Sequence, residues 1–483
     1  MRLQERSAVE AQDIVDEVFA VAGRDARERI WSHAFTEGLI TGMTTREQLV
    51  GFLYNWSSVA LEINCASAQY IYRFPHLQRN VPDVVDYFAS KLIEEWTQPC
   101  PGGHQAALER LVIACGIDKQ EVERAQLIPE VRGFLDGLIW LICSEPADSS
   151  IILIEEWFGE WATLWIAALD RLGIRTGEDD YWQIHRDADG RSNDDGGHRG
   201  GNRRFARSLL RVGLGPDNPL TTWPRNARTS TGMFVRVLDG CLARFASQPP
   251  DSGPAFGRSG PEDPVARATV RAMELGKHPC LTRLTRGASS HVIAGLLMNW
   301  YFLHQRIAQS FARLYHRFIE QFRGNRELAE TFCFRFRDEF LQQKRLAGLE
   351  CAAREVGVTK GMLADPWVIP ETFMLCGFVI RLHSEGTPAE IWALPLPHMF
   401  AVVGAVTCEA LARTGHVDAA RLIRDGFVQP TDSGGAVGTQ LGFEEGARSE
   451  AGEVRRGWSS AYIIDVTEAL FENWLLGCEE QFK

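Results

Sequence analysis

Apolar residues recur along most of the chain at spacings of three and four positions, and no stretch alternates convincingly between apolar and polar side chains. Such spacing places apolar side chains on one face of a helix, whereas alternation is typical of a half-buried strand. The pattern is clearest in the segments Arg46 to Arg73, Val81 to Trp96, Pro129 to Cys143, Ser149 to Leu172 and Thr359 to Leu382. We therefore expect an all-α protein of long helices joined by short turns.

Signals at helix ends agree with this expectation. Thr44 lies three residues before Glu47, and Thr45 three before Gln48, so either pair could form a capping box where the first of these helices begins. Gly173 follows the Ser149 segment directly, as a glycine that terminates a helix does.

The chain repeats itself once. Asn55-Trp56 lies in GFLYNWSSVALEINCASAQYIYR, and Asn299-Trp300 lies in GLLMNWYFLHQRIAQSFARLYHR, at an offset of 299 − 55 = 244. Each segment follows a lead-in of His, eight residues, Gly, one residue and two hydroxyl residues, which runs from His33 to Thr45 and from His278 to Ser290. The repeat predicts two tandem domains of one fold.

The two copies differ in their acidic residues. Glu62 of the first copy aligns with Arg306 at an offset of 244, and Glu155 aligns with Pro395 at an offset of 240. Loss on one side only predicts a working site in the first copy and a structural role for the second.

Length and composition set the domain boundaries. A chain of 483 residues is expected to form two or three domains. The Pro-, Gly- and Ser-rich stretch QPPDSGPAFGRSGPEDP predicts a linker at residues 248–264, between a domain over 1–247 and a degenerate domain over 265–483.

Charge and cysteine usage exclude several classes of protein. A net charge of −12 argues against a nucleic-acid partner, because phosphate contacts need clustered Lys and Arg. Eleven cysteines without a C-x-x-C pair indicate free thiols in a reducing compartment. The longest uncharged stretch, Ile391 to Cys408, contains prolines and a histidine and is a poor membrane span. We expect a cytoplasmic protein with no membrane partner.

Acidic residues and histidines in the first copy stand where apolar residues are expected. Carboxylates from three helices, with imidazoles at the ends of two, are what a helical bundle needs to hold two iron or manganese ions. The candidate ligands are Glu62, Glu94, Glu95, His104, Glu155, His185, Asp189 and His198.

Each candidate also has an ordinary structural explanation. A single Glu in an amphipathic helix lies on the solvated face in roughly 80% of cases. His104 in the loop PGGHQ could cap the next helix, and His185 could be a core histidine. The prediction of a metal site therefore rests on the set of residues and their spacing.

That set resembles the haem-oxygenase-like dimetal oxidases. The family pattern is an early carboxylate, then Glu-x(6–9)-His, then a lone helical Glu about sixty residues later, then His-x3-Asp-x2-His about thirty residues further on. The matching residues are Glu62, then Glu94 or Glu95 with His104, then Glu155, and finally His185 with Asp189.

The chain departs from the pattern at Ser192, where the last His is expected, and His198 offers a substitute across a Gly-rich insertion. Within the first Glu pair, Glu95 shares a face with Phe88 and Leu92, which favours it as the inward residue. Because the segment 187–204 is rich in Gly, Asp and Asn, we expect it to be irregular without metal.

The resemblance implies a non-haem di-iron, O2-dependent oxidase or oxygenase of specialised-metabolite biosynthesis. It would take two Fe(II) ions per chain, the second bound labily, and act on a small amino-acid-derived substrate by N-oxygenation or by oxidative C–C cleavage with decarboxylation. Lys91 and Arg73 are candidate partners for the substrate carboxylate. Alternatives are a metal-free or mononuclear thiaminase-like or cofactor-less enzyme on this fold, and a non-catalytic helical partner protein. A homodimer is also left open.

Overall fold

The computed structural model describes residues 6–73, 81, 89–90, 93, 95–97, 102–118, 127–144, 150–174, 180–189, 197–245, 270, 273–317, 344–364, 366–386, 390–391, 394–428 and 460–481. All regular secondary structure within these ranges is helical, so the expected all-α fold is confirmed. The chain divides into two compact units, Met1–Gly253 and Pro254–Lys483. The division falls inside the stretch 248–264, which itself lies outside the described residues.

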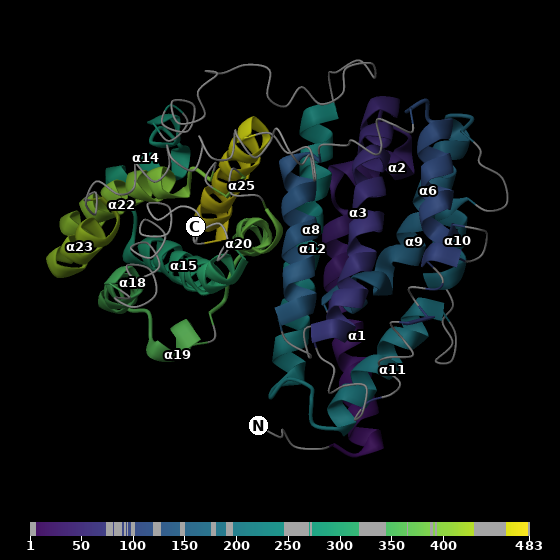
Figure 1. Cartoon of the computed structure of the whole chain (residues 1–483), viewed down its shortest axis with the longest axis horizontal. Helices are drawn as coiled ribbons and strands as arrows, with labels where there is room; N and C mark the ends of the chain where they lie inside the picture. Colours follow the sequence, from purple (N-terminus) through teal and green to yellow (C-terminus); the bar gives the residue numbers. More distant parts are fainter. Residues whose placement is uncertain are drawn as a thin grey trace. The chain divides into compact units, whose positions relative to one another are not determined.

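The first unit is a bundle of long helices. Within it α12 packs against α1 and α8, α8 also packs against α3, and α9 packs against α10; Figure 1 shows the long helices running side by side. The helices are α1 (Ala8–Trp31), α2 (Ala34–Thr41), α3 (Arg46–Arg73), α6 (Gly103–Ala114), α8 (Pro129–Ser144), α9 (Ser150–Arg171), α10 (Tyr181–Asp189), α11 (Gly197–Arg211) and α12 (Pro219–Phe245).

The second unit is also helical throughout its described residues. Its α15 packs against α20 and α18, and α23 packs against both α18 and α22. The elements are α14 (Pro279–Gly287), α15 (Ser290–Arg317), α18 (Lys344–Glu355), α19 (Lys360–Ala364), α20 (Pro370–Glu385), α22 (Leu396–Arg413), α23 (Val417–Ile423), the π-helix η2 (Arg424–Val428) and α25 (Ser460–Gln481).

The start of α3 uses the second of the two predicted capping boxes. The backbone N–H of Thr45 donates to Oε1 of Gln48 at 2.9 Å, and the backbone N–H of Gln48 donates to the Thr45 hydroxyl at 3.2 Å. Helix α9 stops at Arg171, and Gly173, two residues later, adopts a φ of 69°. Both helix-end predictions are therefore confirmed.

The repeated sequence motif has the same structural role in both units. Oδ1 of Asn55 accepts the backbone N–H of Ile128 at 2.8 Å, just before α8. Oδ1 of Asn299 accepts the backbone N–H of Ile369 at 3.0 Å, just before α20. In each unit the repeated Asn thus supplies an acceptor for an amide that precedes a helix and has no helical partner.

The lead-in histidines are helix caps. Nδ1 of His33 accepts the backbone N–H of Phe35 at 3.1 Å at the start of α2, and Nδ1 of His278 accepts that of Cys280 at 3.2 Å at the start of α14. The glycines of the same motif, Gly42 and Gly287, both have positive φ. The repeat therefore encodes helix boundaries, and its shared residues do not themselves mark a site.

Two sequence expectations need correction. The predicted helix from Thr359 to Leu382 is broken into α19 and α20. Pro366 and Pro370 explain the break, because proline disfavours helical backbone in the residue before it and lacks an N–H. The segment 187–204 was expected to be irregular without metal. Its residues 197–204 instead belong to helix α11.

Most of the predicted helix from Val81 to Trp96 lies outside the described residues. Among the helices that the structure does describe, none combines the length and the hydropathy that a bilayer crossing requires.

Candidate metal centre

Two glycines bring α6 against the backbone of Glu95. Gly102 and Gly103 precede His104 and have φ values of 88° and 60°, a conformation that L side chains rarely adopt. A Cβ on Gly103 would lie 2.2 Å from the carbonyl oxygen of Glu95, which leaves no room for any side chain. The sequence PGGH therefore allows His104 to begin a helix directly beside Glu95.

Three of the predicted ligands come together in this region. Glu95, His104 and His185 each offer a ligand atom, and these atoms lie within 4.8 Å of one another. Nδ1 of His104 is 3.3 Å from Oε1 of Glu95, and the His104 and His185 rings have centroids 4.8 Å apart. His104 and His185 are 3% and 6% exposed, so the group could bind a metal ion away from bulk water.

The ring of His185 is oriented by its own helix. Its Nδ1 lies 2.9 Å from the carbonyl oxygen of Tyr181, which can only accept a hydrogen bond, so Nδ1 carries the proton. With the proton on Nδ1, Nε2 is the ring nitrogen of His185 that carries a lone pair, the arrangement common for metal-binding histidines. Tyr181 is held in turn by Trp56 on α3, whose Nε1 donates to the Tyr181 hydroxyl at 2.9 Å.

Aromatic side chains pack around the histidines. The ring of Phe158 on α9 lies 5.5 Å from that of His185, and the Tyr181 ring lies 4.2 Å from it. Such rings exclude water and lower the local dielectric, which strengthens the attraction between a cation and the Glu95 carboxylate.

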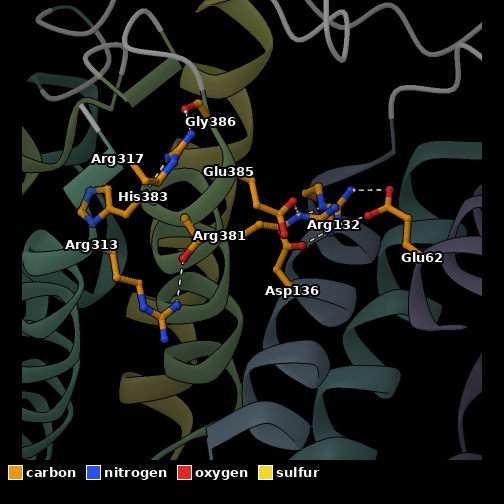
Figure 2. A network of polar contacts seen from close by, with 10 residues as sticks. Glu62, Arg132, Asp136, Arg313, Arg317, Arg381, His383, Glu385 and Gly386 are labelled. Carbon is orange, nitrogen blue, oxygen red and sulfur yellow. Dashed lines mark hydrogen bonds and ion pairs between the residues drawn. The ribbon is translucent and has the colours of Figure 1, made fainter. Parts of the chain in front are cut away.

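The structure does not bring Glu62 into this group. Its two carboxylate oxygens accept hydrogen bonds from Nη1 and Nη2 of Arg132, each at 3.1 Å, as Figure 2 shows. Arg132 is fully buried and also bonds Asp136, from Nε at 2.9 Å and from Nη2 at 2.5 Å. Burial alone would lower the pKa of Arg132, but the charges and hydrogen bonds of Asp136 and Glu62 raise it above its ordinary value.

The remaining predicted ligands fall where the structure gives no side-chain description. They are Glu94, Glu155, Asp189 and His198, together with Ser192 of the family pattern and the carboxylate partners Lys91 and Arg73. For the first Glu pair, Glu95 is the member that the structure places in the group.

The second unit carries different residues at the corresponding place. Helix α18 repeats α6 at an offset of 241: Leu108 and Leu349 are both 0% exposed, and Gly116 and Gly357 both have positive φ after the helix. The same offset places an arginine, 104 + 241 = 345, where α6 has its histidine.

The guanidinium group of Arg345 contacts residues of η2. Nε of Arg345 donates to the carbonyl oxygen of Gly426 in η2 at 2.7 Å, and its guanidinium lies 5.6 Å from the centroid of the Phe427 ring. A cation bound in this way repels metal ions. Among its described residues, the second unit has no group of three ligand side chains like that of the first.

The cysteines described in the first unit are all buried. Cys115 and Cys143 are buried, as expected for core thiols. Burial raises the pKa of Cys115 to about 11, so it remains a thiol at neutral pH. Cys65 lies outside the side chains described.

Comparison of the sequence with known proteins identifies no relative. No protein-family model matches the chain, and a search of curated proteins finds no significant match.

Three residues that bind or orient the predicted ligands or their partners were missed from the sequence. Arg132 and Asp136 are four residues apart on α8, a spacing that signals an ion pair on one helix face. Tyr181 gave no comparable signal, because its carbonyl oxygen orients His185 through the backbone.

Proposed function

We propose that the first unit is a non-haem iron centre of an O2-dependent oxidase or oxygenase. The observation that carries the proposal is the buried Glu95, His104 and His185 group. Two imidazoles and one carboxylate with open positions are the ligand set of non-haem Fe(II) oxygenases. Bound there, iron would supply the ability to activate O2, and the three side chains would hold it.

The surrounding residues prepare the site for that chemistry. The carbonyl oxygen of Tyr181 keeps the proton of His185 on Nδ1, so the other ring nitrogen carries the lone pair that would bind iron. Phe158 and Tyr181 exclude water beside the same ring, which protects a reactive centre from side reactions.

The resemblance to haem-oxygenase-like dimetal oxidases supports a second iron ion as part of the same proposal. Glu155, Asp189 and His198 are the residues that would hold it. The substrate class proposed is a small amino-acid derivative that undergoes N-oxygenation or oxidative C–C cleavage with decarboxylation.

One observation favours a mononuclear centre as the second candidate. The Glu62 carboxylate, the first ligand in the family pattern, is already bound by both terminal nitrogens of Arg132. A centre that does not recruit Glu62 has the ligand set of one iron ion. The iron-to-protein ratio after anaerobic reconstitution separates the two candidates.

The function is tested by O2 consumption. Protein reconstituted anaerobically with Fe(II) is mixed with O2 and a set of amino acids and their N- and C-substituted derivatives, and products are followed by mass spectrometry with isotopically labelled O2. We expect Glu95→Gln to abolish iron-dependent O2 uptake and Glu109→Gln, the same change elsewhere in this region, to retain it. O2 uptake that Glu95→Gln leaves unchanged would refute the proposal.

A further inference from the structure

A chain of aromatic rings begins at the metal group. Between ring centroids, Tyr181 lies 4.2 Å from His185 and 5.1 Å from Trp182. Trp182 in turn lies 5.8 Å from Trp161 on α9. Trp182 and Trp161 are both 0% exposed, so this part of the chain runs entirely through the core.

The row of aromatic rings continues across the helical bundle to the protein surface. Trp161 lies 5.9 Å from Trp157, which is also fully buried, and Trp157 lies 6.4 Å from Trp31 at the end of α1. Trp31 is partly exposed. Four indole rings thus lead from the metal group to solvent, and no step between neighbouring centroids exceeds 6.4 Å.

The indole N–H groups of the three buried tryptophans in this row have a weak hydrogen-bond acceptor or none among the described residues. Nε1 of Trp182 and Nε1 of Trp157 have no hydrogen-bond partner among the described residues, and Nε1 of Trp161 donates to the Thr36 hydroxyl at 3.2 Å. An indole that loses an electron becomes a radical cation, which is trapped when a nearby base removes its proton. Without such a base, the cation can take an electron from the next ring.

The second unit shows that the fold does not require these tryptophans. Helix α22 repeats the end of α9 at an offset of 415 − 173 = 242: Ile174 N–H bonds the Leu169 carbonyl, and His416 N–H bonds the Leu411 carbonyl. At this offset the positions of Trp157, Trp161 and Trp165 hold Met399, Val403 and Thr407. All six side chains are 0% exposed.

We propose that Trp182, Trp161, Trp157 and Trp31 form a pathway that carries single electrons between the metal group and the protein surface. The proposal rests on the proposed function, and it adds a protective activity to it. Trp182 would give one electron across the Tyr181 ring to an oxidised centre that holds no substrate, and each tryptophan would be refilled by the next. Trp31 finally loses one electron and gives its Nε1 proton to water, and a thiol in solution restores it by donating a hydrogen atom.

The first test uses the iron-loaded chain. Ferrous protein without substrate or thiol receives a pulse of O2, and oxidised residues are mapped by peptide mass spectrometry. We expect oxidation at Trp31 in the wild type and a severalfold lower level in Trp161→Phe. Trp165→Phe removes an equally buried ring of the same helix, which lies 4.9 Å from the Trp182 ring and 5.6 Å from the Trp161 ring. The direct step from Trp182 to Trp161 remains in this variant, so it should leave Trp31 oxidation unchanged.

Trp367 in the second unit, 56% exposed, controls for an oxidant that diffuses. Equal oxidation of Trp367 and Trp31, or equal effects of the two α9 variants, would overturn the pathway.

A second test needs no metal and separates this proposal from the function. A ruthenium photo-oxidant is attached to Ser32→Cys in metal-free protein whose exposed Cys351 is replaced by Ser, and light-driven oxidation of Trp182 and Tyr181 is mapped in the same way. We expect inward transfer that Trp161→Phe abolishes and Trp165→Phe retains. Inward transfer without any iron-dependent oxidation would refute the iron centre and leave the pathway standing, whereas transfer indifferent to Trp161→Phe would refute the pathway.

Discussion

The ring of His185 donates a hydrogen bond from Nδ1 to the carbonyl oxygen of Tyr181, one helical turn earlier, at 2.9 Å. The bond fixes which ring nitrogen can bind a metal before any metal arrives. Because the acceptor is a backbone atom, a Tyr181→Phe change preserves it and removes only the hydroxyl that Trp56 binds. The orientation of the ligand thus depends on α10 being helical at this point.

Gly103→Ala should abolish metal binding while the bundle remains folded. The new Cβ would lie 2.2 Å from the Glu95 carbonyl oxygen, so α6 must move and separate His104 from Glu95. Gly173→Ala is the matched control, because Gly173 also has positive φ but has no atom within 4 Å of the added Cβ. Each change should cost about 1–3 kcal/mol in backbone strain, and only the first should lower Fe(II) affinity in a titration followed by equilibrium dialysis.

Arg132→Met should destabilise the first unit by about 3–5 kcal/mol, because it leaves two carboxylates without their buried cation. Glu62→Gln should destabilise less, since Asp136 still pairs with Arg132. Urea denaturation measures both. If Glu62 stays on Arg132 when iron binds, Glu62→Gln will leave the iron content unchanged. A loss of iron would mean that Glu62 moves to the metal, as the dimetal pattern requires.

Asn55→Leu and Asn299→Leu should each destabilise their own unit by about 1–3 kcal/mol. The effect of Asn299→Leu should be the larger, because Oδ1 of Asn299 also accepts the Thr372 hydroxyl at 2.9 Å. Each substitution removes the acceptor for one buried backbone N–H, of Ile128 or of Ile369. Neither should change Fe(II) affinity, because the repeated Asn-Trp motif builds the fold. Loss of iron binding at native stability in Asn55→Leu would contradict this.

The second unit should lose stability in acid through His304. Burial, reinforced by the charge of Arg345, lowers the pKa of His304 to about 3. Between pH 6.5 and that value the unfolded chain binds a proton that the folded chain does not, so stability falls with decreasing pH by at most about 1.4 kcal/mol per pH unit. His304→Leu should flatten the pH dependence in that window, measured by denaturation at a series of pH values. An unchanged slope would show that His304 is not buried in its neutral form.

The sequence was sufficient for helix positions wherever periodicity and end signals agree. The range Arg46–Arg73 is reproduced residue for residue in α3, and α9 stops just before Gly173. The break between α19 and α20 was missed, because the helical spacing of apolar residues continues through Pro366 and Pro370. The backbone at these two prolines cannot continue the helix.

The sequence predicted only part of the candidate site, because it identifies ligand types and does not reveal their contacts. Glu95, His104 and His185 were identifiable as polar residues at metal-binding spacings, but spacing does not say which carboxylate has another partner. Glu62 has one in Arg132, seventy residues away in sequence. Contacts over such separations depend on how helices pack, which a single sequence does not specify.

We propose that Glu95, His104 and His185 bind iron. The most direct measurement is the iron-to-protein ratio after anaerobic dialysis against Fe(II), compared between the wild type, His185→Ala and His304→Ala. Both variants remove a buried histidine, but only His185 belongs to the ligand group. We predict that His185→Ala loses bound iron and that His304→Ala keeps it, whereas equal iron in all three proteins would contradict the account.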